Sequence, residues 1–109
     1  MLDVHEYEDL EGRSPFAAWF ADLDAAAAAK ITIAVARMGR GNLSNVKGVG
    51  EGVLEYKLDF GPGYRVYFGR EGDVLLILLA GGTKRGQQRD ISAAKLRWAD
   101  YKRRKRQSE

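Results

Sequence analysis

The chain has 109 residues, of which 45% are hydrophobic and 30% are charged, a balance typical of one soluble globular domain and not of a disordered chain. It contains no cysteine, which excludes disulfides, thiolate metal sites and thiol catalysis. The formal net charge is +3, and two basic groups, Lys102–Arg106 and the set of Lys84, Arg85 and Arg89, favour an anionic partner.

The hydrophobic pattern indicates a cytoplasmic protein without a membrane partner. The longest apolar run, Val74 to Ala80, has seven residues, whereas a membrane-spanning helix needs roughly 20. The N-terminal residues Met1–His5 place no basic segment ahead of an apolar stretch, so we expect no signal peptide.

The N-terminal part predicts a strand followed by two helices. Residues 2–7 alternate modestly, as a strand would. Ser14 before Pro15 is typical of an N-cap and first helical position, and the following apolar stripe consists of Phe16, Trp19, Phe20 and Leu23. Asp24 predicts the N-cap of a second helix that ends at Gly39 or Gly41. Its apolar stripe consists of Ile31, Ala34, Val35 and Met38. The two helices should form a hairpin that packs on a sheet.

The middle of the chain predicts strands. Residues 42–52 are polar and glycine-rich, which indicates a loop with room for a short extended piece over 46–49. Residues 53–80 contain three strand-like runs separated by turns at 61–63 and 70–72. A three-residue loop at the first turn would pair Leu58 with Val66 and would place the apolar residues of both strands on one face.

The same register defines the opposite face of this hairpin. It places Lys57 across from Tyr67 and Asp59 across from Arg65, so that two cations and a tyrosine share one surface. The third run, residues 73–80, is apolar without alternation, as expected for a central strand covered on both faces.

The C-terminal part predicts a basic loop and a helix. Gly81 and Gly82 end the last strand, and residues 83–86 form the loop. The final helix begins at Gln87 or Asp90, and its apolar stripe consists of Ile91, Ala94, Trp98 and Tyr101. Residues 102–109 read as a basic, frayed tail. The order β-α-α-β-β-β-α predicts a single α+β domain over residues 1–109, with a twisted antiparallel sheet, an N-terminal helical hairpin and a C-terminal helix.

Three segments in this order resemble the RelE/ParE toxin superfamily. They are Tyr56-Lys57-Leu58, the segment GPGYRVYF at 61–68, and the segment LAGGTKRGQQRDI at 79–91. More narrowly, the chain is similar to the HigB-type, phage Gp49-like branch known as addiction module killer proteins, and the resemblance covers nearly its whole length.

The resemblance implies the toxin of a type II toxin-antitoxin system. Its partners would be a cognate helix-turn-helix antitoxin, the ribosome and mRNA, with operator DNA reached only through the antitoxin. The antitoxin would occlude the Lys57/Arg65 surface or displace the last helix. Many relatives cleave mRNA in the ribosomal A site, while ParE relatives inhibit DNA gyrase. A non-catalytic protein that only binds its antitoxin is a third alternative.

Matching the strands to RelE-like active sites implies catalytic roles for Lys57, Arg65 and Lys84. RNA cleavage by attack of the 2′-hydroxyl requires a base, stabilisation of charge on phosphorus and an acid for the 5′ oxygen, and no metal or cofactor. Lys57 would be the base, Arg65 the phosphate clamp and Lys84 the proton donor.

Further residues are expected to support this site. Asp90 is either the N-cap of the last helix or a catalytic acid or base. Tyr67, or Tyr64 if the faces are exchanged, would stack an RNA base or help to position the RNA backbone. Arg85 and Arg89 would bind the RNA backbone.

Overall fold

A computed structural model describes residues 1–108, so that Glu109, the last residue of the predicted tail, lies outside the described residues. The elements in chain order are β1 (Asp3–Glu6), α1 (Pro15–Ala21), α2 (Ala25–Gly39), β2 (Val46–Gly50), β3 (Val53–Lys57), β4 (Tyr64–Glu71), β5 (Leu75–Thr83), the 3-10 turn η1 (Lys84–Gly86) and α3 (Gln87–Ser108). Both predicted N-caps are confirmed, because the side chains of Ser14 and Asp24 accept hydrogen bonds from backbone N–H groups three residues later.

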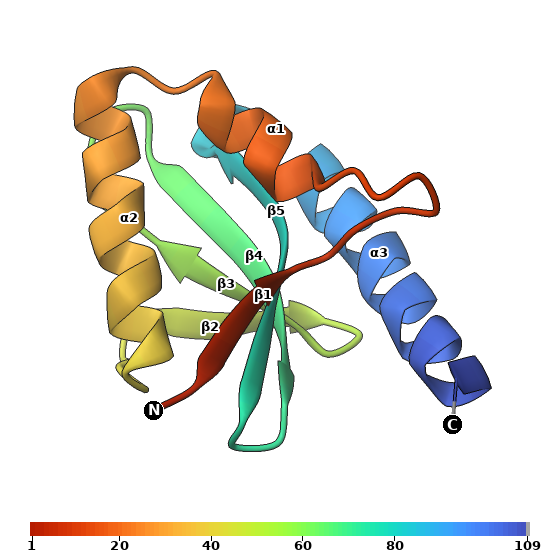
Figure 1. The fold of residues 1–109 in the computed structure, drawn as a ribbon. Helices are drawn as coiled ribbons and strands as arrows, with labels where there is room; N and C mark the ends of the chain where they lie inside the picture. Colours follow the sequence, from red (N-terminus) through yellow and green to blue (C-terminus); the bar gives the residue numbers. More distant parts are fainter. Residues whose placement is uncertain (109) are drawn as a thin grey trace.

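The five strands form one mixed sheet in the order β1-β5-β4-β3-β2 (Figure 1). The α+β class is therefore confirmed, but the expectation of a purely antiparallel sheet is wrong, because β1 pairs with β5 in parallel. The chain passes from β1 through α1 and α2 to β2 at the opposite edge of the sheet and returns through β3 and β4, so that β5 lies beside β1. Such a long connection permits parallel pairing, which a tight turn cannot join. The extended piece foreseen near residue 46 is the edge strand β2.

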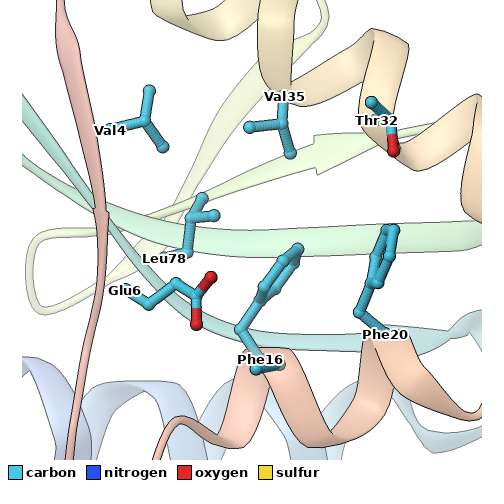
Figure 2. Close-up of a pocket in the computed structure, with 8 residues that line it drawn as sticks. Val4, Glu6, Phe16, Phe20, Thr32, Val35 and Leu78 are labelled. Atoms are coloured by element: carbon cyan, nitrogen blue, oxygen red, sulfur yellow. The ribbon is translucent and has the colours of Figure 1, made fainter.

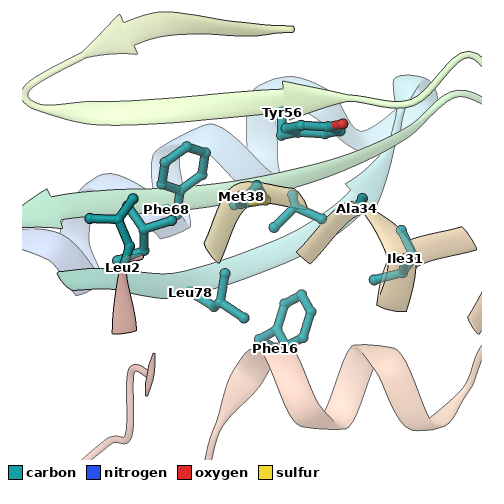
Figure 3. Close-up of a cluster of buried hydrophobic side chains, with 10 residues drawn as sticks. Leu2, Phe16, Ile31, Ala34, Met38, Tyr56, Phe68 and Leu78 are labelled. Carbon is teal, nitrogen blue, oxygen red and sulfur yellow. The ribbon is translucent and has the colours of Figure 1, made fainter. Parts of the chain in front are cut away.

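The sheet has a hydrophobic cluster on each face. The cluster beneath α1 and α2 contains Leu2, Phe16, Ile31, Ala34, Met38, Tyr56, Val66, Phe68, Leu76 and Leu78 (Figure 3). The cluster beneath α3 contains Tyr7, Val53, Tyr67, Ile77, Leu79, Ala80, Ile91, Ala94 and Trp98. From Leu76 to Leu79, successive residues of β5 enter opposite clusters, which explains its unbroken apolar run and confirms a central strand covered on both faces.

The β3–β4 hairpin has a different register from the predicted one. Lys57 lies opposite Arg65 and Tyr56 opposite Val66, and the Leu58 N–H donates to the Tyr64 carbonyl at 2.9 Å. The connection is thus the five-residue segment 59–63. It contains two glycines at positive φ, 55° and 79°, values that a glycine adopts without strain. The partner of Val66 is therefore Tyr56 and not Leu58, two residues away from the prediction. Because side chains alternate between the faces with a period of two, the residues of the paired strands keep their predicted faces.

Gly81 and Gly82 lie inside β5, which continues to Thr83, so the prediction that they end the strand is wrong. A Cβ atom at Gly81 would lie 2.0 Å from the Trp19 ring, and one at Gly82 would lie 2.0 Å from an Asp90 carboxylate oxygen. The two glycines therefore allow α1 and α3 to approach the sheet closely from opposite faces.

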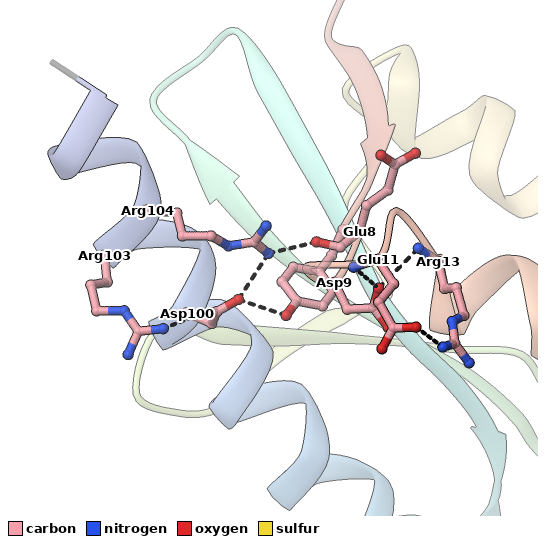
Figure 4. Close-up of polar contacts among 8 residues, drawn as sticks. Glu8, Asp9, Glu11, Arg13, Asp100, Arg103 and Arg104 are labelled. Carbon is pink, nitrogen blue, oxygen red and sulfur yellow. Dashed lines mark hydrogen bonds and ion pairs between the residues drawn. The ribbon is translucent and has the colours of Figure 1, made fainter.

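The C-terminal residues 102–108 belong to α3, so the prediction of a frayed tail is wrong for them. Asp100 accepts a hydrogen bond from the Tyr7 hydroxyl at 2.7 Å and pairs with Arg104 at 2.8 Å and with Arg103 (Figure 4). The Arg104 side chain also donates to the Glu8 carbonyl. These contacts attach the end of α3 to the N-terminal segment, which keeps it helical.

We expect Asp100→Asn to remove an acid-sensitive part of the stability. The hydrogen bond from Tyr7, and then Arg104 and Arg103, hold the pKa of Asp100 below its ordinary value of 3.8. Because the folded pKa is the lower one, this stabilisation is present above the unfolded pKa and is lost as pH falls through the folded pKa. The variant should cost about 1 kcal/mol near neutral pH, and its difference from the unmodified protein should shrink from about pH 6 to about pH 2.

Urea unfolding followed by circular dichroism over this pH range measures that difference. Asp3→Asn, at an exposed position of β1, is the control and should show no such trend. A cost of Asp100→Asn that stays constant with pH would contradict the prediction.

Candidate functional site

The β3–β4 loop and η1 surround a hollow of about 480 Å³, here called the hairpin hollow. It is lined by Lys57, Asp59, Phe60, Gly61, Pro62, Gly63, Arg65 and Lys84. Lys57 and Arg65 meet there because they are direct partners at the end of the hairpin. Lys84 joins them because it follows Thr83, which pairs with Tyr64 at the start of β4. Three of the predicted catalytic residues thus converge.

The three cations of the hairpin hollow differ in exposure. The Lys57 side chain is 52% exposed and its ammonium lies 3.6 Å from the Asp59 carboxylate, and Lys84 is exposed. The Arg65 side chain is only 5% exposed and donates to the Gly63 carbonyl at 2.7 Å. Two exposed ammonium groups therefore lie beside a buried guanidinium. The predicted pairing of Asp59 with Arg65 is wrong, because the register places Asp59 within the loop.

Glu55 is a buried partner of this site that sequence reasoning missed. Its side chain is fully buried, with an oxygen 3.7 Å from Arg65 Nε and 2.9 Å from the amide of Gln87, which donates to it. Its other oxygen lies 3.7 Å from the Lys47 ammonium. One sequence signal could have identified it. Glu55 follows Val53 by two residues, so both side chains point to the same face of β3, and Val53 lies in the cluster beneath α3. Glu55 thus ties the Arg65 side chain to the first turn of α3.

Tyr67 does not share an exposed surface with Lys57, so the prediction that it stacks an RNA base is wrong. The residue is completely buried beneath α3, and its hydroxyl has no hydrogen-bond partner. Burial, and then the charge of Glu55, raise the pKa of Tyr67 above its ordinary value. The sequence pattern predicted that this face of the hairpin is exposed to solvent. In the structure α3 covers the part of the face that contains Tyr67.

We expect Tyr67→Phe to leave the stability unchanged or to raise it by up to about 1 kcal/mol, because it removes a buried hydroxyl without a partner. Urea unfolding measures the change. A clear loss of stability in the variant would contradict the prediction.

The remaining predicted residues lie outside the hairpin hollow. Tyr64 is half-buried on the other face, where its ring packs 6.1 Å from that of Phe60. Asp90 lies in the first turn of α3, which begins at Gln87, so it is not the N-cap. Burial raises the pKa of Asp90, although the Arg89 and Arg97 charges oppose the effect. Arg85, within η1, and Arg89, in the first turn of α3, are both exposed. The Arg89 Nε atom lies 3.8 Å from a carboxylate oxygen of Asp90.

A separate apolar hollow of about 340 Å³ lies between β1, α1 and α2 (Figure 2). Phe16, Phe20 and Val35 point into it, with Glu6 and Thr32 as its polar residues. None of the predicted site residues lines it. Lys57, Arg65 and Lys84 thus line the hairpin hollow and not this apolar one.

Two further properties follow from the described part of the chain. Within residues 1–108, no group of three or more His, Asp or Glu side chains is arranged to hold a metal ion. No helix in the same range is long and apolar enough to cross a membrane.

The sequence is similar to that of an uncharacterized protein of Haemophilus influenzae. The two are 43% identical over 82 residues, which cover 74% of this chain and 83% of the other protein. No protein-family model matches the chain.

Proposed function

The chain belongs to the family of this Haemophilus influenzae protein, and we propose that it is the toxin of a type II toxin-antitoxin system. In this proposal it is a HigB-type member of the RelE/ParE superfamily and a ribosome-dependent mRNA endoribonuclease in the cytoplasm. We also propose that the fold has the topology of RelE-like toxins and that α1 and α2 form its N-terminal helical hairpin. A cognate helix-turn-helix antitoxin would silence the protein by covering the hairpin hollow.

The convergence of Lys57, Lys84 and Arg65 in the hairpin hollow supports this function best. A phosphate placed there would meet two exposed ammonium groups and the guanidinium behind them, against the single carboxylate of Asp59. Such an arrangement favours a dianionic transition state over a singly charged ground state. It suits phosphoryl chemistry on a nucleic-acid backbone.

The proposed reaction uses the substrate's own 2′-hydroxyl as the nucleophile. Its proton passes to a base, O2′ bonds to phosphorus, and the bond from phosphorus to O5′ breaks, which gives a 2′,3′-cyclic phosphate and a 5′-hydroxyl end. Lys57 is the proposed base, and Lys84 donates a proton to the leaving O5′. Arg65, held from below by Glu55 and Gly63, stabilises the charge on the phosphate oxygens without moving.

Cut-site mapping in a purified translation system tests the proposal. Addition of the folded protein should arrest translation and should produce new mRNA ends at the ribosomal A site. Intact message in arrested ribosomes would overturn the nuclease function. A DNA supercoiling assay in parallel would then detect the ParE-like alternative, gyrase inhibition. Unaffected growth on induced expression would instead indicate a non-catalytic, antitoxin-binding protein.

A further inference from the structure

A second hollow of about 300 Å³ adjoins the hairpin hollow on the side of α2. The two hollows share Lys57, Asp59 and Phe60 in their linings. The second one adds Lys30, Ile33 and Arg37 from α2. The surface around the candidate site therefore continues past the hairpin onto α2, a helix that no sequence pattern connects with the site.

The cations of α2 are available to an external anion. Lys30 and Arg37 are exposed, and within residues 1–108 neither forms an ion pair with a carboxylate. They are seven residues apart, or about 10 Å along the helix axis, and lie on the same face. The joined hollows thus contain five cations, namely Lys30, Arg37, Lys57, Arg65 and Lys84, against Asp59.

Phe60 stands where the two hollows meet. Its ring packs against that of Tyr64, with 6.1 Å between centroids and 26° between planes. The Lys30 ammonium lies 5.3 Å from the centre of the Phe60 ring. Because this ammonium lies over the ring, its movement onto a phosphate would uncover the ring for an unpaired base, and single-strand grooves combine such aromatic platforms with backbone-binding cations.

We propose that the joined hollows form a track for single-stranded RNA, in which Lys30 and Arg37 bind phosphates flanking the cleaved one and Phe60 stacks a base. This inference rests on the proposed function and extends the substrate contact from one phosphate to several. An acidic protein segment could also meet cations here. RNA is favoured because the unpaired cations and the ring continue directly from the hollow assigned to the reacting phosphate, as in other single-strand grooves.

Binding of a fluorescent single-stranded RNA, 2′-O-methylated to prevent cleavage, tests the track by anisotropy over a range of salt concentrations. The double variant Lys30→Ala/Arg37→Ala should bind about tenfold more weakly at low salt. The slope of log affinity against log salt should fall in magnitude by about 1.4, or 0.7 for each lost contact. Alanine favours the helix at both positions, so α2 should remain folded. Phe60→Ala should weaken binding by about tenfold without changing the slope.

Arg13→Ala/Arg70→Ala is the matched control, since it removes the same charge at exposed positions that line neither hollow and should change affinity less than about twofold. On programmed ribosomes, Lys30→Ala/Arg37→Ala should raise the half-saturating concentration and leave the saturated cleavage rate unchanged. If the unmodified protein binds and cleaves RNA but the double variant binds RNA as well as the control does, the proposed RNA track is wrong while the proposed nuclease function is unaffected. If the unmodified protein neither binds nor cleaves RNA, both proposals are wrong.

Discussion

Lys84→Ala should reduce the rate of mRNA cleavage on programmed ribosomes by about 10²- to 10⁴-fold, the usual contribution of a positioned acid. Lys84 is an exposed ammonium that lines the hairpin hollow beside Arg65. Its removal would leave the departing 5′ oxygen without a proton donor and the phosphate with one cation fewer. Lys84→Ala should affect the chemical step and not the fold, because within residues 1–108 the exposed Lys84 side chain forms neither an ion pair nor a hydrogen bond.

Two companion variants make this prediction specific. Arg85→Ala removes the same charge from the next residue of η1, which does not line the hollow. Loss of its predicted contact with the RNA backbone should raise the half-saturating concentration but change the saturated rate less than about threefold. Lys84→Arg keeps the charge but cannot readily donate a proton. It should restore the half-saturating concentration but not the saturated rate. Equal losses for Lys84→Ala and Arg85→Ala would contradict a role for Lys84 in the reaction.

Glu55→Ala should destabilise the protein by about 3 kcal/mol, because removal of one partner from a buried charged set leaves the others uncompensated. Arg65 would lose its buried counter-charge, and the amide of Gln87 would lose its acceptor. For a domain of this size, a loss of about 3 kcal/mol lowers the midpoint of thermal unfolding by more than about 10 °C. Calorimetry or urea unfolding measures the change.

The controls for Glu55 separate burial from charge. Glu51→Ala removes an exposed carboxylate that pairs with Lys95 and should cost less than about 1 kcal/mol. The double variant Glu55→Leu/Arg65→Met replaces the buried ions by apolar groups and should recover much of the stability, as such replacements do elsewhere. Its cleavage should still be impaired because Arg65 is gone. A Glu55→Ala protein as stable as the Glu51→Ala protein would contradict the structural role of Glu55.

Local signals predicted most of the elements correctly. Ser14-Pro15 and Asp24 defined the helix starts because the capping hydrogen bonds join residues three apart in the chain. The apolar stripes of all three helices contribute to the cores, since helical periodicity alone decides which side chains can share a face. The faces of the β3–β4 hairpin were also right, because an error of two residues in register preserves a period of two.

The residue pattern alone predicted which cations gather at the hairpin end: Lys57 and Arg65 share a face by alternation, and Lys84 follows the strand that pairs with β4. Their exposure to solvent depends on contacts between distant parts of the chain. The packing of α3 across the sheet buries Tyr67 and the pair formed by Glu55 and Arg65, and it keeps Asp90 out of the hairpin hollow. The approach of α2 to the hairpin likewise brings Lys30 and Arg37 beside Lys57. These contacts join residues far apart in the chain, and no local periodicity carries information about which helix will cover a given face of a sheet.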